Sequence, residues 1–86
     1  MTSEGEIPLL TLYSRQWCHL CHEMESALEA LQQELRFDLE ILDVDAFPDI
    51  EALYDEKVPV LVGGDHEICH HVLDRSAVRA YLLNFR

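Results

Sequence analysis

Short apolar runs alternate with longer amphipathic stretches along the chain. Residues 9–13 are almost all apolar, which is typical of a strand buried on both faces. From residue 18 to residue 35 the apolar side chains recur every three or four positions, on one face of a helix, at Leu20, Met24, Ala27, Leu28, Leu31 and Leu35. The pattern predicts a strand over 9–13, a loop over 14–17 and an amphipathic helix over 18–35.

The remaining elements are shorter. They are expected to be a strand over 37–44, a turn over 45–49, a short helix near 49–55, a strand over 58–62 and a returning strand over 67–72. Gly63-Gly64-Asp65 between the last two strands is typical of a hairpin turn, because glycine allows positive φ. Asp74 is suited to cap a last helix, whose apolar face carries Val78, Tyr81, Leu82 and Phe85.

The element order is therefore βαβαββα, in the α/β class. A right-handed first crossover makes the first two strands parallel, and the glycine hairpin makes the last two antiparallel. We expect a four-stranded mixed sheet with helices on both faces, in one domain over residues 1–86 with a loose tail at 1–6. The crevice of such a sheet lies beyond the carboxyl ends of its parallel strands, where the loop over 14–17 begins.

Composition and charge exclude several classes of partner. The chain has 86 residues and a mass of 10.0 kDa, and six Lys and Arg against seventeen Asp and Glu give a net charge of −11. So negative a surface repels phosphate backbones and anionic lipid, which excludes nucleic-acid binding and electrostatic membrane docking. Residues 1–8 lack the positive charge and apolar stretch of a secretory signal, so we expect a cytoplasmic protein. No feature of the sequence indicates its oligomeric state.

The cysteines carry the candidate chemistry. Cys18 and Cys21 form a C-x-x-C pair at the predicted helix start, and Cys69 is left over. The first turn of a helix has unpaired N–H groups and the positive end of the macrodipole, and both favour a thiolate. We expect Cys18 to be a nucleophile with a pKa of about 3.5–7, against about 8.5 for a free thiol. Cys21, one turn further on and more buried, would resolve the mixed disulfide.

Three neighbouring side chains are candidates for supporting roles. His19 lies between the two cysteines and Arg15 precedes them, and a positive charge on either would stabilise the thiolate. The carboxylates of Glu23 and Glu25, one to two turns along the helix, oppose this effect, so the sign of the net effect stays open. Trp17 has two interpretations: it contacts a client protein, or it packs over the site as a loop aromatic.

The run from Leu12 to Cys21, Leu-Tyr-Ser-Arg-Gln-Trp-Cys-His-Leu-Cys, resembles the first strand and active-site loop of glutaredoxins. Lys57-Val58-Pro59 resembles their Thr-Val-Pro segment, and the similarity covers nearly the whole element order. It is closest to small bacterial glutaredoxin-like proteins with a Cys-x-Leu-Cys site. The resemblance implies a thioredoxin-like fold and a thiol–disulfide oxidoreductase, with Cys18 attacking and Cys21 resolving. It also implies a cis Pro59, and a Val58 backbone that pairs with a bound thiol peptide through an unpaired N–H and carbonyl.

The sequence departs from that family at the residues that would hold glutathione. Glutaredoxins have Pro-Tyr between their cysteines, where this chain has His19-Leu20, and their Gly-Gly-x-Asp-Asp segment is replaced by residues 70–75, in which only Asp74 matches. Protein disulfides or small thiols are therefore the expected partners, and glutathione as a co-substrate has less support. We expect no bound cofactor and no metal.

Three alternatives remain open at this stage. Residues 18–22 also spell C-x-x-C-H, the pattern of covalent haem attachment. Zinc would take Cys18, Cys21 and His22, with more ligands from residues 69–71, although these also fit an edge strand with a small buried Cys69. The domain could also be a binding module that keeps the fold without catalysis, because a fold does not fix a function.

Overall fold

The computed structural model describes residues 7–84, so the expected tail at 1–6 and Phe85 lie outside the described residues. Its elements are β1 (Leu9–Ser14), α1 (His19–Leu31), β2 (Asp38–Asp43), the 3-10 helix η1 (Val44–Ala46), α2 (Pro48–Tyr54), β3 (Val60–Gly63), β4 (His66–His70) and α3 (Arg75–Leu83). The predicted βαβαββα order is confirmed, with η1 added. Among residues 7–84, no helix has the length and apolar character needed to cross a membrane.

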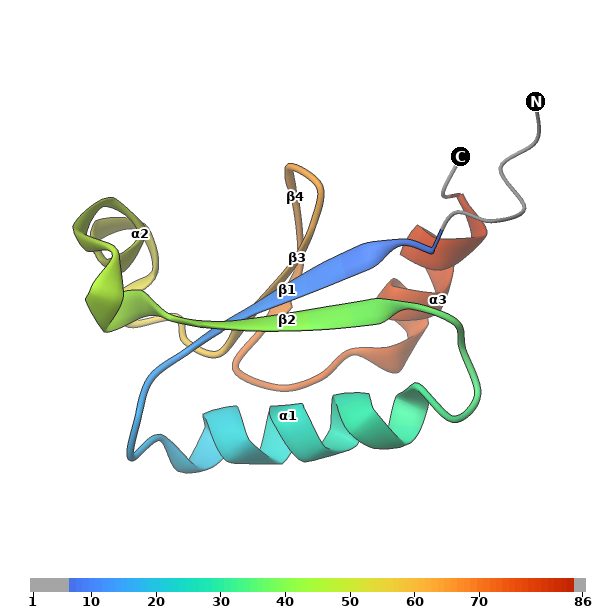
Figure 1. Ribbon diagram of the computed structural model, residues 1–86, viewed down its shortest axis with the longest axis horizontal. Coiled ribbons are helices and arrows are strands. Elements are labelled where there is room, and N and C mark those ends of the chain that lie inside the picture. The colour runs from blue at the N-terminus through green and yellow to red at the C-terminus, as the bar shows by residue number, and fades with distance from the viewer. Residues whose placement is uncertain (1–6, 85–86) are drawn as a thin grey trace.

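The sheet is mixed, as predicted, with the strand order β2-β1-β3-β4. β1 and β2 are parallel, while β3 runs antiparallel to both β1 and β4. The register pairs Tyr13 near the end of β1 with Val60 at the start of β3. The residues that follow Tyr13 and those that precede Val60 therefore meet at one end of the sheet. Figure 1 shows α2 near this end, where β1 and β2 finish.

α1 ends at Leu31, four residues before the predicted end at Leu35. The N–H groups of Gln33 and Glu34 bond to the carbonyls three residues back, at 3.1 and 2.9 Å, which tightens the chain into a turn. The side chain of Gln32 also donates to the carbonyl of Phe37 at 2.9 Å. Leu35 still packs against the core from this turn. The apolar periodicity therefore continues beyond the helix itself.

The strands next to the predicted site are shorter than expected. β3 begins at Val60 and not at residue 58, because Pro59 has no N–H for a ladder hydrogen bond. β4 ends at His70, because His71 has a φ of 66°, which is incompatible with a strand. β2 ends at Asp43, whose side chain accepts a hydrogen bond from the N–H of Asp45 at 2.9 Å and caps η1.

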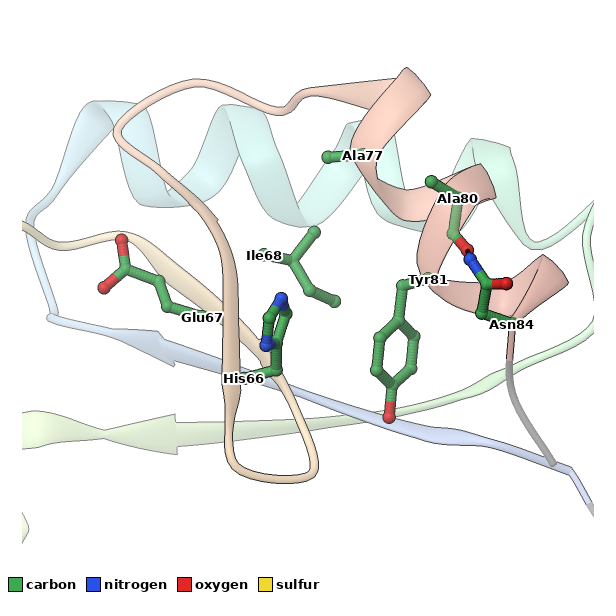
Figure 2. Close-up of a pocket in the computed structure, with 7 residues that line it drawn as sticks. All are labelled: His66, Glu67, Ile68, Ala77, Ala80, Tyr81 and Asn84. Atoms are coloured by element: carbon green, nitrogen blue, oxygen red, sulfur yellow. Dashed lines mark hydrogen bonds between the residues drawn. The ribbon is translucent and has the colours of Figure 1, made fainter.

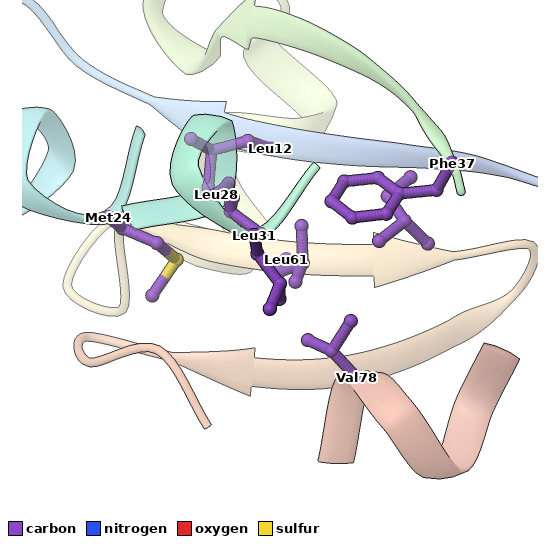
Figure 3. Close-up of a cluster of buried hydrophobic side chains, with 8 residues drawn as sticks. Leu12, Met24, Leu28, Leu31, Phe37, Leu61 and Val78 are labelled. Atoms are coloured by element: carbon purple, nitrogen blue, oxygen red, sulfur yellow. The ribbon is translucent and has the colours of Figure 1, made fainter. Parts of the chain in front are cut away.

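The core lies between the sheet and two helices. Figure 3 shows it as a cluster of buried side chains from β1, α1, β3, α3 and the residue before β2: Leu10, Leu12, Met24, Leu28, Leu31, Phe37, Leu61 and Val78. α2 contributes no buried residue. Its Tyr54 contacts Tyr13, with ring centroids 5.3 Å apart, on the sheet face opposite Leu12. Helices thus lie on both faces, but α2 meets its face only near the end of β1.

Candidate active site

Cys18 is the N-cap residue of α1. It has extended backbone angles, φ −105° and ψ 109°, and its Sγ accepts a hydrogen bond from the N–H of Cys21 at 3.2 Å. Its carbonyl oxygen accepts from the N–H of His22 at 3.1 Å, which opens the helical hydrogen-bond ladder. The predicted helix start is therefore confirmed, and Sγ occupies the place where a capping oxygen normally satisfies a free N–H group.

Cys18 and Cys21 are joined by a disulfide, and their Cα atoms are 5.2 Å apart. The two sulfurs differ in access, because Cys18 is half-buried whereas Cys21 is only 1% exposed. An incoming disulfide can reach the first sulfur and not the second. This asymmetry is what the predicted roles of nucleophile and resolving thiol require, and the roles themselves stay predictions.

Trp17 points into solvent beside Cys18. It is 95% exposed, so the interpretation that it packs over the site is wrong. Its φ of 62° is in the left-handed region, where a bulky residue is a genuine outlier. The loop thus holds a large aromatic side chain outward in a conformation that costs about 1–2 kcal/mol.

Arg15 is surrounded by carboxylates. Its guanidinium contacts Asp45 at 3.1 Å, Asp55 at 3.0 Å and Glu51 at 3.5 Å, and it also donates to the carbonyl oxygen of Asp55 at 3.2 Å. These contacts raise the pKa of Arg15, the hydrogen bond to Asp55 most of all. These carboxylates offset the positive charge of Arg15. Its role in stabilising the thiolate stays a prediction, and its contacts connect the active-site loop to η1 and α2.

His19 is paired with a carboxylate one turn along the helix. Its Nε2 lies 2.8 Å from Glu23 Oε2, and its side chain is 85% exposed. The carboxylate of Glu23 lies close enough to offset any positive charge that the ring would place near Cys18. The thiolate-stabilising role of His19 also stays a prediction.

Val58 and Pro59 lie at the same end of the sheet as the loop that leads to Cys18, because they directly precede Val60. The peptide bond between them is cis. The expected unpaired backbone edge is wrong for the N–H of Val58, which donates to the carbonyl oxygen of Tyr54 at 3.2 Å. The turn that closes α2 therefore uses this donor. Pro59 is buried, and its carbonyl oxygen accepts from the N–H of His71 at 2.8 Å.

A hollow of about 190 Å³ lies between the first turns of α1 and the segment that joins β4 to α3. Its lining comprises Leu20, Glu23, Met24, Ala27, His71, Val72, Leu73 and Arg75. Leu20 lies between the two cysteines in sequence. No local pattern in the sequence singles out His71; the only signal is that this segment replaces the glycines that the family resemblance leads one to expect.

The larger groove, about 570 Å³, lies between β4 and α3. Figure 2 shows Ile68 and Tyr81 facing each other across it, with Ala77 and Ala80 on the helix side. None of the predicted site residues lines this groove. Size alone therefore does not locate the thiol chemistry.

The zinc alternative has no support from the arrangement of its ligands. In the part of the chain that the structure describes, no three Cys, His, Asp or Glu side chains are grouped so that they could hold a metal ion. The two histidines proposed as extra ligands bond elsewhere: His70 Nδ1 lies 2.8 Å from Glu67 Oε2, and His71 Nε2 lies 2.9 Å from the carbonyl oxygen of Glu56.

Cys69 is a half-buried free cysteine that packs against the core. Burial raises the pKa of its thiol, so less of it is thiolate at neutral pH. In the fully reduced protein at pH 7, we expect iodoacetamide to modify Cys69 at least about tenfold more slowly than Cys18. Peptide mapping by mass spectrometry over time checks this order. Faster labelling of Cys69 would show that the reactive sulfur has been misassigned.

The comparisons with known proteins agree with this geometry. The chain is similar to protein Ne2328 from Nitrosomonas europaea, a solution structure with 39% sequence identity and a TM-score of 0.83 that covers 95% of this chain and 99% of that one. A structural-genomics target protein from X. campestris has 32% identity and a TM-score of 0.65, over 90% of this chain and 99% of that one. No curated protein matches the chain.

More distant neighbours show the fold alone. The thioredoxin of Fasciola hepatica has 18% identity and a TM-score of 0.59, over 93% of this chain and 82% of that one. The predicted thioredoxin-like fold is thereby confirmed. Residues 9–83 match the family described as "Glutaredoxin-like domain (DUF836)", which is nearly all of the described chain. The chain belongs to this glutaredoxin-like domain family.

Proposed function

We propose that the protein is a thiol–disulfide oxidoreductase of glutaredoxin-like type, in which Cys18 and Cys21 cycle between dithiol and disulfide. The observation that carries the proposal is the position of Cys18 Sγ: half-buried at the N-cap of α1, 3.2 Å from the N–H of Cys21. A backbone donor and the positive end of the helix both favour a negative charge on this sulfur. The family match and the bonded cysteine pair support redox chemistry in general.

The exchange proceeds in two displacements. The Cys18 thiolate attacks one sulfur of the substrate disulfide, the S–S bond breaks, and the leaving sulfur departs as a thiolate that takes up a proton. The thiol of Cys21 then loses its proton and attacks Cys18 Sγ, which releases the second substrate thiol. The substrate gains two electrons and two protons, and the protein ends as the Cys18–Cys21 disulfide. Run in reverse, the same steps oxidise a dithiol.

We assign substrate docking to Trp17, Val58 and Pro59. Trp17 offers an exposed aromatic surface next to Cys18, and aromatic side chains supply large contact areas at little entropic cost. Protein disulfides or small thiols are the proposed partners, in the cytoplasm. Glutathione has less support as a co-substrate, because residues 70–75 lack the glycine pair of the segment that helps hold it in glutaredoxins.

The proposal is tested by following reduction of insulin and of a small aromatic disulfide by the dithiothreitol-reduced protein. We expect both to proceed faster than with an equal concentration of a free dithiol peptide of the sequence of residues 17–22. Equal rates would contradict the proposal and favour the binding-module alternative. Titration of the same protein against glutathione gives the reduction potential, and mass spectrometry of the samples shows whether a glutathione adduct forms.

A further inference from the structure

His71 connects the end of β4 to the segment that carries Val58 and Pro59. Its Nε2 lies 2.9 Å from the carbonyl oxygen of Glu56, and its backbone N–H donates to the carbonyl oxygen of Pro59 at 2.8 Å. Because a carbonyl oxygen can only accept, Nε2 carries the proton and donates. His71 therefore holds the chain at two points: at Glu56, two residues before Val58, and at Pro59, directly after it.

Between Tyr54, whose ring contacts Tyr13, and the buried Pro59, residues 55–58 contain no buried side chain. α2, which leads into these residues, contributes no buried residue, and Leu53 is 65% exposed. Among the described residues, the core cluster draws on β1, α1, β3, α3 and Phe37 before β2, but takes no member from α2. Residues 55–58 themselves are held by polar contacts, including that of Lys57 with Glu67 at 3.0 Å.

The backbone of His71 is strained. Its φ is 66°, and the N–H of Val72 bonds to the carbonyl oxygen of His70 at 2.7 Å across this turn. Such turns with a positive φ at the central residue are rare. A glycine would adopt the same backbone without strain, but it would have no ring to reach Glu56. An outlier of this kind points to a role for the side chain that offsets its cost.

His71 also faces the N-terminal half of α1, the helix that begins directly after Cys18. It lines the hollow of about 190 Å³ together with Leu20 and Met24 from the first turns of α1. The same residue therefore contacts Glu56 and Pro59 and borders a hollow that is also lined by Glu23 and by Leu20, which lies between the two cysteines in sequence.

We propose that His71 is a positioning residue for substrate docking: its ring fixes the segment 55–59, so that Val58 and Pro59 keep a constant place beside the dithiol. This inference rests on the proposed function, since it assigns docking to that segment. A protein disulfide, which must lie along the segment, depends on His71. A small disulfide, which needs only Cys18, does not.

The test compares His71→Gly, which relieves the strain and removes the ring, with His71→Gln, whose side-chain amide can still donate near the position of Nε2. His66→Gln, an exposed histidine at the other end of β4, is the matched control. We expect His71→Gly to raise the KM for insulin about tenfold, the equivalent of one hydrogen bond, with the rate on a small aromatic disulfide unchanged. His71→Gln should recover part of the loss.

A second readout does not depend on activity. The N–H groups of Lys57 and Val58 both bond to the carbonyl oxygen of Tyr54. Their hydrogen exchange should accelerate about tenfold in His71→Gly and stay near the wild-type rate in His71→Gln. Unchanged exchange and KM in His71→Gly, or equal losses on both disulfides, would overturn the inference. Should the wild type be inactive on both disulfides, the proposed function fails, and the exchange rates alone decide whether His71 fixes the segment.

Discussion

Replacing Cys18 with serine should abolish disulfide exchange. A serine hydroxyl at the N-cap would still satisfy the N–H of Cys21, so α1 should form normally, but it cannot form a disulfide with a substrate sulfur. We expect the rate of insulin reduction to fall at least about 100-fold, to the uncatalysed level. The measurement is the turbidity of precipitating insulin chains, with circular dichroism to verify the fold.

Cys69→Ser is the matched control for this variant. The substitution is chemically the same, but Cys69 is a free half-buried thiol whose pKa is raised by burial. Its activity should stay within about twofold of wild type, as is usual for a residue that touches no reacting atom. If Cys18→Ser retained turnover, or if Cys69→Ser lost it, the catalytic assignment would be wrong.

Replacing Cys21 with serine should instead trap the intermediate. Cys18 can still attack a disulfide, but no second sulfur remains to release the product, so a mixed disulfide accumulates. After incubation with glutathione disulfide, we expect intact-mass spectrometry to show one added glutathione on nearly every chain, and peptide mapping to place it on Cys18. Turnover of insulin should fall about 100-fold or more, because the attack of Cys21 on Cys18 Sγ, which releases the product, is blocked.

Two outcomes would contradict the proposed role of Cys21 as the resolving thiol. An adduct found on Cys69 in place of Cys18 would mean that burial does not protect that thiol. Full turnover without an accumulated adduct would mean that release does not need Cys21, and that an external thiol completes the cycle. The double variant Cys21→Ser, Cys69→Ser separates the two, since only Cys18 then remains to carry an adduct.

The position of Cys18 could be predicted from the sequence because its determinants are local. An apolar run followed by a short loop and a three-to-four periodicity fixes where β1 ends and α1 begins, within one residue. The end of α1 could not be predicted as closely from the apolar spacing. Leu35 continues the apolar spacing, yet it reaches the core from a turn, so periodicity reports burial and not hydrogen bonding.

The surroundings of the dithiol could not be predicted in the same way, because they come from distant segments. Arg15 meets Asp45 and Asp55, which lie 30 and 40 positions further along the chain. Its local context suggested a free cation beside Cys18. His71 reaches Glu56 across 15 positions, through a backbone conformation that no propensity favours for histidine in a strand pattern. Such contacts depend on the folded sheet and not on neighbouring residues.

In the proposed mechanism, the N-cap geometry is the main stabiliser of the Cys18 thiolate, because Arg15 and His19 both have anionic partners. These carboxylates lie within hydrogen-bonding distance and offset any positive charge that the two side chains place near Cys18. The N–H of Cys21, in contrast, donates directly to Cys18 Sγ. A hydrogen bond to the charged form, together with the helix dipole, lowers the pKa of a thiol without any charged side chain.

The rate at which iodoacetamide alkylates Cys18, measured as a function of pH on the reduced Cys69→Ser variant, is the most direct test of this chemistry. We expect the rate to follow a single ionisation with a pKa of about 3.5–7, well below the value of about 8.5 for a free thiol. A midpoint at or above about 8.5 would mean that the N-terminus of α1 does not activate this sulfur, and the proposed mechanism would fail.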